Sequence, residues 1–447
     1  MTEWPKHRVD HLQERGILFV EDGNHGEYRP RQNEFQALGT AFIRASDMDA
    51  GQIHFDSAQR INDIALKRIR KGFGRGGDVL FSHKGTVGKL ALAPTNAPPF
   101  VCSPQTTFWR VMNEERLDRR FLYYYMQSDE FTNQWNARKA ETDMADYVSL
   151  TSQRELTVAL PEIVLQRSIG QFLGALDSKI ELNRRMNRTL EHMGAQLFKS
   201  WFVEFDPVVA KAAGRKPYGM DEATAALFPK GFEESDLGPI PKGWRISKIG
   251  DAVRVVGGST PRTEVAEFWV EGQHCWVTPR DLSRLSDPVV LSSERYITDK
   301  GLAQVSSGLL PVGTVLLSSR APIGYLAITE VPVAVNQGFI AMVCNDSLPN
   351  QYAFHWTREN LDEVIGRAGG TTFAEISKQN FRPIPLLIPE DKLLRLFQLM
   401  ASTWHGQIVA NVKETQYLSE LRDRLLPELL SGEIRLSNTE KHAAKVL

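Results

Sequence analysis

The sequence contains little cysteine. Its 447 residues include three cysteines, Cys102, Cys275 and Cys344, which lie far apart along the chain. This pattern excludes a disulfide framework and a Cys-x-x-Cys metal knuckle, and it favours a reducing compartment. We expect no metal cluster among the ten histidines and no catalytic serine, because no G-x-S-x-G elbow occurs. The sequence therefore predicts a protein with no metal site and no catalytic residues of its own.

Long apolar stretches and a net excess of one charge are also absent. No window approaches eighteen uninterrupted apolar residues, and the opening MTEWPKHRVD contains no apolar core. We therefore expect a cytoplasmic protein with no membrane span and no signal peptide. The net charge is −1, whereas a dedicated phosphate-binding protein usually carries an excess of Lys and Arg.

Basic residues are nevertheless concentrated in two segments. Residues 60–89 contain eight basic and two acidic side chains, and residues 242–262 contain five basic and one acidic. Either segment alone is consistent with an ordinary solvated face. Because both flank corresponding parts of the internal repeat described below, they are candidates for a surface that binds nucleic acid.

Two motifs resemble cofactor fingerprints but have the wrong context. Gly72, Gly74 and Gly77 have G-x-G-x-x-G spacing, yet a strand-like stretch follows them where a dinucleotide site needs a helix. NAPPF (96–100) resembles an adenine-methyltransferase signature, but Ala97 separates the asparagine from the prolines. We expect no cofactor in this chain.

The chain contains an internal repeat, which decides the fold class. GDVLFSHKGTVGKLAL (77–92) is matched 236 residues later by GTVLLSSRAPIGYLAI (313–328), with seven identical residues. The match extends outward to further pairs of segments: FIRASDM (42–48) with WVTPRDL (276–282), CSPQTTF (102–108) with AVNQGFI (334–340), and LTSQ (150–153) with ISKQ (376–379). Two diverged copies of one domain explain this pattern.

Each copy ends in a helical segment. There the repeat runs without gaps at an offset of 228, and apolar residues recur with a 4,3,4,3 spacing typical of a coiled-coil seam. Asn183 and Asn411 occupy the same seam position, where a buried polar residue fixes register at a cost in stability. A helix of about 40 residues is about 60 Å long. We expect two long helices that pair with each other.

The predicted fold is mixed α/β, of the α+β class. It has two repeated domains separated by two long antiparallel coiled-coil helices, with pseudo-twofold symmetry. The expected parts are a first domain (1–160), a first helix (161–205), a surface linker (206–243), a second domain (244–388), a second helix (389–436) and a tail (437–447).

Several segments together resemble the specificity subunit of type I restriction-modification systems. They are LFKSWFVEFDPVVAK after the first helix, FPKGFEESDLGPIPKGW before the second domain, VGGSTPRTEVAEFW followed by WVTPRDL, and LRDRLLPELLSGEIRL near the end. The resemblance covers nearly the whole chain, and the opening residues, GILFVEDGNHGEYRPRQNEF, are its least typical part.

The resemblance implies a non-catalytic subunit that binds double-stranded DNA. Each domain would be a target-recognition domain for one half of a bipartite, gapped, asymmetric site. The paired helices would dock two copies of an adenine methyltransferase subunit, and through them the restriction and translocation subunit. AdoMet would then be bound by the methyltransferase partner, and ATP and Mg by the restriction partner. Reading heads on one face of DNA lie about 34–36 Å apart, which helices of this length can span.

Candidate DNA-binding residues come from loops with amide, hydroxyl or basic side chains, which suit phosphates and base edges. Gln105 and Gln337 could equally satisfy buried backbone at a strand end, and Asp47 and Asp281 are better explained as caps. In the first domain the candidates are Asn24, His25, Tyr28, Arg29, Lys84 and Gln105. In the second domain they are Ser259, Thr260, Arg262, Arg280, Arg320, Asn336, Gln337, Thr371 and Thr372.

Two other functions remain open from the sequence. The chain could be a methyltransferase or nuclease fused to specificity domains, which the missing methyltransferase motifs argue against. Alternatively, the helices could form a protein-interaction scaffold with no DNA role, which should show no salt-dependent binding to duplexes.

Overall fold

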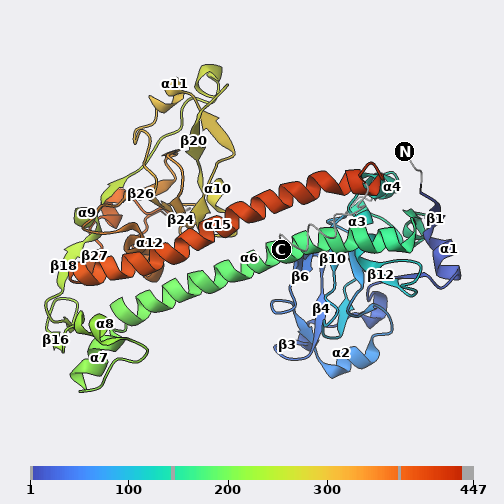
Figure 1. Ribbon diagram of the computed structural model, residues 1–447, viewed down its shortest axis with the longest axis horizontal. Coiled ribbons are helices and arrows are strands. Elements are labelled where there is room, and N and C mark those ends of the chain that lie inside the picture. The colour runs from blue at the N-terminus through green and yellow to red at the C-terminus, as the bar shows by residue number, and fades with distance from the viewer. Residues whose placement is uncertain (1–3, 142–145, 371–373, 435–447) are drawn as a thin grey trace. The chain divides into compact units, whose positions relative to one another are not determined.

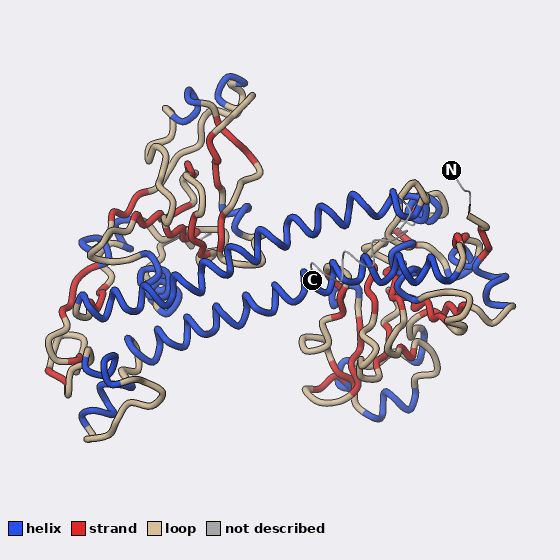
Figure 2. Tube along the Cα trace, viewed as in Figure 1, coloured by secondary structure: helices blue, strands red, loops and turns tan. Residues whose placement is uncertain are grey.

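The computed structural model describes residues 4–141, 146–370 and 374–434. The chain forms two compact units (Figures 1 and 2). Unit 1 consists of Met1–Ile180 and Gln416–Leu447, and unit 2 of Glu181–Thr415. Each unit therefore contains one copy of the repeated domain together with parts of both long helices.

Unit 1 contains two stacked sheets. In one, order β10-β9-β12-β2, all neighbours are antiparallel. In the other, order β3-β7-β4-β11-β8, β4 and β11 are parallel. The strands are β2 (Leu18–Asp22), β3 (Phe35–Gln36), β4 (Thr40–Ile43), β7 (Arg60–Ile61), β8 (Phe73–Gly74), β9 (Val79–Ser82), β10 (Leu90–Leu92), β11 (Phe100–Cys102) and β12 (Thr106–Val111).

The alternation of side chains along β9 explains how the first sheet is covered on both faces. Leu80 packs toward the second sheet, in a cluster with Phe100. Val79 and Phe81 point to the opposite face and pack in a cluster with residues of three helices. The helices are α3 (Arg119–Tyr125), α4 (Asp129–Asn136) and the first part of α6 (Ile163–Phe202). All four residues of β9 are buried because the strand lies between these two layers.

Unit 2 repeats this plan. A five-stranded sheet has the order β19-β26-β23-β24-β21, and a three-stranded sheet has the order β22-β20-β25 with β20 and β25 parallel. The strands are β19 (Arg254–Val256), β20 (His274–Val277), β21 (Val289–Val290), β22 (Arg295–Ile297), β23 (Val315–Ser318), β24 (Leu326–Thr329), β25 (Val333–Val335) and β26 (Phe339–Val343).

The repeat is visible at the level of single hydrogen bonds. The Ser82 hydroxyl accepts from the Lys89 N–H at 2.8 Å, and the Ser318 hydroxyl accepts from the Tyr325 N–H at 2.8 Å. In both copies this serine clip holds the loop between β9 and β10, or β23 and β24, against the end of the preceding strand. The two repeated domains predicted from the sequence are therefore confirmed.

The two long helices, α6 and α15 (Asp391–Leu430), each contain 40 residues. In unit 2, Asn183 Nδ2 donates to Glu414 Oε2 (2.7 Å) and Asn411 Nδ2 donates to Asn187 Oδ1 (2.8 Å). Numbers rise along one helix as they fall along the other, so the helices pack antiparallel, as expected. No described helix, these two included, is long and apolar enough to cross a membrane.

The segment between α6 and the second domain, which we expected to be a surface linker over 206–243, is mostly exposed and contains two short helices. They are α7 (Asp206–Ala212) and α8 (Glu222–Ala226). Phe228 packs against Trp201 with ring centroids 5.1 Å apart, and both are buried. The sequence did not predict these short helices, because scattered aromatic residues in a Gly- and Pro-rich stretch give no periodic signal.

Two tryptophans occupy equivalent positions where the chain enters the two domains. Trp244 contacts Phe202 and Phe205 near the end of α6, with ring centroids 5.9 and 5.7 Å apart. Trp4, which lies 240 residues earlier, packs in the unit 1 core that includes Leu429 near the end of α15. The chain thus enters each domain in the same way, at the end of a long helix.

Candidate functional site

In each domain, three loops meet at one end of the sheet that contains β9 in unit 1 and β23 in unit 2. Strands β9, β12 and β2 are antiparallel neighbours, with Thr106 opposite Ser82 and Thr107 opposite Asp22. The end of β9, the start of β12 and the end of β2 therefore lie together. We call this the first loop edge, formed by residues 22–25, 83–84 and 103–105.

Unit 2 has the equivalent arrangement. Ser318 at the end of β23 lies opposite Phe339 at the start of β26, which also pairs with β19. The second loop edge is therefore formed by residues 257–260, 319–320 and 335–337. Topology thus brings together candidates that are separated by up to about 80 residues in the sequence of each domain.

One glycine in each copy sets how closely these loops approach. A Cβ atom on Gly23 would lie 1.8 Å from the Ser103 carbonyl oxygen, and a Cβ atom on Gly258 would lie 1.6 Å from the Val335 carbonyl oxygen. No side chain can occupy such a space, so both positions require glycine. Each loop edge therefore depends on a glycine that lies against a neighbouring carbonyl oxygen.

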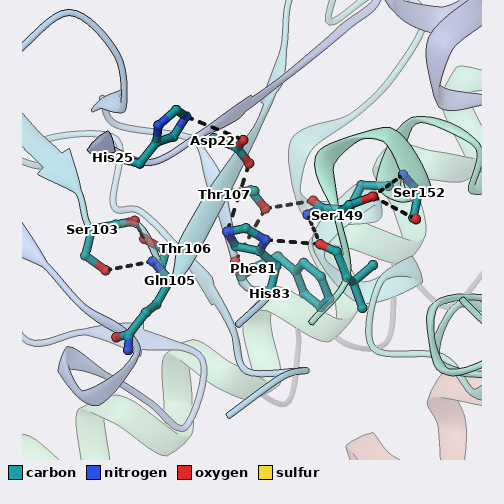
Figure 3. Close-up of polar contacts among 12 residues, drawn as sticks. Asp22, His25, Phe81, His83, Ser103, Gln105, Thr106, Thr107, Ser149 and Ser152 are labelled. Atoms are coloured by element: carbon teal, nitrogen blue, oxygen red, sulfur yellow. Dashed lines mark hydrogen bonds and ion pairs between the residues drawn. The ribbon is translucent and has the colours of Figure 1, made fainter. Parts of the chain in front are cut away.

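The first loop edge has a buried polar centre (Figure 3). Asp22 lies between two histidines, with its carboxylate oxygens 3.9 Å from His25 Nε2 and 4.0 Å from His83 Nε2. His83 is 3% exposed, and its Nδ1 lies 3.0 Å from the Val148 carbonyl oxygen. Burial lowers the pKa of His83 below its usual value. Asp22 Oδ1 and His83 Nε2 are buried and have no hydrogen-bond partner.

Exposed side chains surround this centre. Lys84 Nζ lies 5.8 Å from the centroid of the Tyr147 ring, which in turn lies 5.4 Å from the ring of His83. The Gln105 side chain is exposed, while its backbone N–H donates to Ser103 Oγ at 3.3 Å and its carbonyl oxygen accepts from the His83 N–H at 2.9 Å. Lys84 and Gln105 are thus exposed beside the buried centre.

The second loop edge presents different side chains on the same frame. Thr260 Oγ1 donates to Gln337 Oε1 at 2.7 Å, so these two candidates form one exposed pair. Arg320 Nη1 lies 3.6 Å from the Glu375 carboxylate. Arg320 and Glu375 form the same backbone bridge as Lys84 and Tyr147 in the first domain.

Other candidates of the second domain have structural contacts. Ser259 Oγ donates to the Gln304 carbonyl oxygen and accepts from the Ser306 N–H, and Asn336 Oδ1 accepts from the Gly338 N–H. Arg262 is exposed near this edge, and Arg280 Nε lies 4.0 Å from the Glu294 carboxylate. Thr371 and Thr372 lie outside the described residues.

The remaining candidates of the first domain are divided between interior and surface. Asn24 is 1% exposed, so its side chain lies inside the domain and not on the loop surface where we expected it. Tyr28 lies under the Arg70 guanidinium, whose carbon is 4.9 Å from the ring centroid, and Arg29 is exposed.

Asp47 and Asp281 are caps, as the sequence indicated. Asp47 Oδ2 accepts from the Arg44 N–H and Asp281 Oδ2 accepts from the Thr278 N–H, each at 2.8 Å and each in a capping box. They fix the backbone at equivalent places in the two copies.

The first basic segment is only partly available to a ligand. Arg68 pairs with the Glu34 carboxylate and so lowers the pKa of Glu34 to about 2. Lys89 Nζ donates to two backbone carbonyl oxygens, and so does the Arg60 guanidinium. Lys67, Arg70, Lys71, Arg75 and Lys84 are exposed. The charge surplus counted from the sequence thus overstates the free positive surface.

One pair of histidines has the spacing of a metal motif, which our expectation of no metal cluster did not take into account. His7 and His11 have H-x-x-x-H spacing, with Glu14 following. Across residues 4–141, 146–370 and 374–434, however, no three His, Cys, Asp or Glu side chains are grouped so that they could hold a metal ion.

Sequence reasoning missed Asp22, His83, Tyr147, Ser319 and Glu375 at the loop edges. His83 and Ser319 occupy the same position, 236 residues apart, and both leave a buried polar atom without a hydrogen bond. Their difference in residue type hid them, because a search for shared residues discards positions where the copies differ.

The fold and the loop edges define a class of duplicated recognition protein, in which one frame displays two sets of side chains. A family model described as type I restriction modification DNA specificity domain matches residues 25–192 and 241–393. The chain belongs to this family of specificity subunits.

Relatives with known names agree. The specificity subunit of the type I restriction enzyme HindI from Haemophilus influenzae is 25% identical over 453 residues, covering 90% of this chain and 96% of that protein. The MjaIX specificity subunit from Methanocaldococcus jannaschii is 33% identical over 178 residues, which cover 39% of this chain and 41% of that relative. A crystal structure of a type I S subunit from M. genitalium has the same fold, with a TM-score of 0.58 at 15% identity over 95% of this chain and 96% of that one.

Proposed function

We propose that this chain is the non-catalytic subunit that gives a type I restriction-modification complex its DNA sequence specificity. Each loop edge reads one half of a bipartite, gapped and asymmetric site in double-stranded DNA. The observation that carries this proposal is the pairing of an equivalent backbone bridge with different side chains: Lys84 beside Tyr147 in one copy, and Arg320 beside Glu375 in the other. A duplicated frame with diverged contacts suits two different half-sites.

The long helices supply a second part of the proposal, the docking of two adenine methyltransferase subunits. Leu182, Met186 and Met193 lie at helical spacing along α6 and are 36–44% exposed. An apolar stripe exposed to water is typical of a surface that binds another protein. The restriction subunit then joins through the methyltransferases. AdoMet belongs to the methyltransferase partner, and ATP and Mg belong to the restriction partner.

The experiment that tests this function is to map methylated adenines in a host that expresses the chain with and without the methyltransferase subunit of its system. We expect a gapped, asymmetric motif only when both are present. A continuous motif would contradict the bipartite reading, and no motif would contradict the partnership.

Two further measurements separate the alternative functions. Methylation by this chain alone, supplied with AdoMet, would make it an enzyme. Binding of the chain to random duplexes tests the scaffold alternative. A scaffold with no DNA role would show no salt-dependent affinity for these duplexes, because phosphate contacts always produce such an affinity.

A further inference from the structure

The carboxylate of Asp22 is not satisfied by the protein. Asp22 Oδ1 is the one carboxylate oxygen among the described residues that is buried without a hydrogen bond. Other shielded carboxylates have partners: Asp78 accepts twice from Arg110, and Asp177 accepts from Arg422 and Tyr124. A buried acceptor without a donor costs free energy, so such an exception needs a physical cause.

The groups nearest to this oxygen do not provide the missing donor. His83 Nδ1 faces the Val148 carbonyl oxygen, which can only accept, so we place the ring proton on Nδ1. His83 Nε2 then turns a lone pair toward Asp22, and the Pro104 carbonyl also faces the ring. His25 Nε2, at 3.9 Å, is beyond hydrogen-bond distance. The centre therefore consists of acceptors and needs a donor from outside.

The position of Asp22 indicates where that donor comes from. Asp22 is the last residue of β2, at the loop edge, and its side chain is 19% exposed. Rotation about the Cβ–Cγ bond is soft for a carboxylate, so either oxygen can turn outward. Neutral N–H donors at base edges in the major groove are the amino groups of adenine N6 and cytosine N4.

We propose that Asp22 accepts a hydrogen bond from the exocyclic amino group of one adenine or cytosine in the half-site read by the first domain. This assignment rests on the proposed function and adds a specificity residue to it. The position equivalent to Asp22 in the second domain is Gly257, which has no side chain. The effect of Asp22 is therefore confined to one half-site.

The test uses the assembled complex of this chain with its methyltransferase subunit. Duplexes carry the mapped motif with, at one position at a time, purine in place of adenine or 2-pyrimidinone in place of cytosine, which removes only the amino group. For the wild type we expect one position in one half-site where this change weakens binding by about 10-fold or more. For Asp22→Ala, which removes both acceptor oxygens, the same change should alter binding less than about 2-fold, because the coupled pair is already broken.

Two matched variants control the test. Glu21→Gln removes the neighbouring negative charge but keeps an oxygen that accepts from the Gly72 N–H, so it separates general charge effects from base reading. Thr260→Val alters the second loop edge and should change a position in the other half-site. Retention of that second half-site by Asp22→Ala shows that the variant is folded and assembled.

Each outcome decides the matter. If Asp22→Ala keeps the wild-type motif and the same sensitivity to the missing amino group, or if Glu21→Gln has the same effect, the assignment is wrong while the specificity function stands. If Asp22→Ala does not assemble, the wild-type duplex series still decides, because the absence of any sensitive position in that half-site overturns the assignment. If the wild type yields no motif, the proposed function itself fails.

Discussion

A single buried histidine makes the stability of unit 2 depend on pH. His355 is 5% exposed and stacks on Phe198, with ring centroids 5.8 Å apart and planes 22° apart. Burial lowers the pKa of His355 to about 3, with a smaller contribution from the nearby positive charges of Arg358 and His405. His355 is therefore neutral in the folded protein at pH 7 and at pH 5.

The sign of the resulting pH effect follows from proton uptake. An unfolded histidine has a pKa of about 6.5, so between pH 6.5 and about 3 the unfolded chain binds a proton that the folded chain does not. The stability that His355 contributes is therefore fully present above pH 6.5 and is lost as the pH falls toward about 3. We predict that His355 lowers the free energy of unfolding by about 2 kcal/mol between pH 7 and pH 5.

Urea unfolding at the two pH values measures this contribution. His355→Phe keeps the aromatic packing without the titrating ring and should lose about 2 kcal/mol of the wild-type pH dependence. His405→Gln is the control, since His405 is partly exposed and pairs with Glu330 at 2.9 Å. An unchanged pH dependence in His355→Phe would contradict the prediction.

Residue-level prediction from the sequence succeeded where chemistry is local and failed where it depends on register. Asp47 and Asp281 were interpreted as caps because a cap and its target are three residues apart. Asp22 and His83 were missed because 61 residues separate them. Only the antiparallel register of β2, β12 and β9 places them on one edge, and that register cannot be read from residue types.

Among the elements, the two long helices α6 and α15 pack through an apolar seam that contains hydrogen-bonded amide side chains. Asn411 Nδ2 donates to Asn187 Oδ1, and Gln407 Nε2 donates to Asn411 Oδ1, each at 2.8 Å. Asn187 and Asn411 are both at most 2% exposed. A buried amide that loses its partner keeps its desolvation cost, whereas loss of both amides removes that cost.

We predict that Asn411→Leu alone destabilises unit 2 by about 1–3 kcal/mol. The double variant Asn187→Leu, Asn411→Leu should recover most of that loss, because two leucines pack as an ordinary seam pair. Urea titrations of the two single variants and the double variant give the coupling energy. Strictly additive effects would show that the two amides do not act as a pair.

The helices were the easiest elements to predict, since a 4,3,4,3 spacing sustained over four heptads is specific to a helical seam. We expected them at 161–205 and 389–436, and they run Ile163–Phe202 and Asp391–Leu430. The short helices α7 and α8 were missed. With seven and five residues they are too short to show a period, and tertiary contacts of Phe228 and Val208 hold them.

At the scale of the whole molecule, Trp4 and Trp244 have equivalent roles in the two units. We therefore expect the fold not to depend on the order in which the chain contains the two domains. In each unit a domain begins beside the end of a long helix, at Trp4 near Leu429 and at Trp244 near Phe202.

We predict that a circular permutant keeps the fold and the recognised motif. Its original ends would be joined by a flexible linker, and new ends opened at Tyr218, a fully exposed residue between Gly214 and Gly219. Methylation mapping with the partner subunit should give the wild-type motif. Opening the chain at Met186, inside α6, is the control and should abolish it. A lost motif in the Tyr218 permutant would contradict the equivalence of Trp4 and Trp244 as domain starts.

The serine clip at Ser82 and Ser318 also leaves the side chains of the following loop free to differ. Each clip holds its loop through one hydroxyl and backbone groups, so it makes no demand on the side chains that follow. Positions 83 and 84 accordingly carry His and Lys in one copy, while 319 and 320 carry Ser and Arg. The side chains at these positions can therefore differ between the two copies while the same hydrogen bond to the serine hydroxyl fixes the loop.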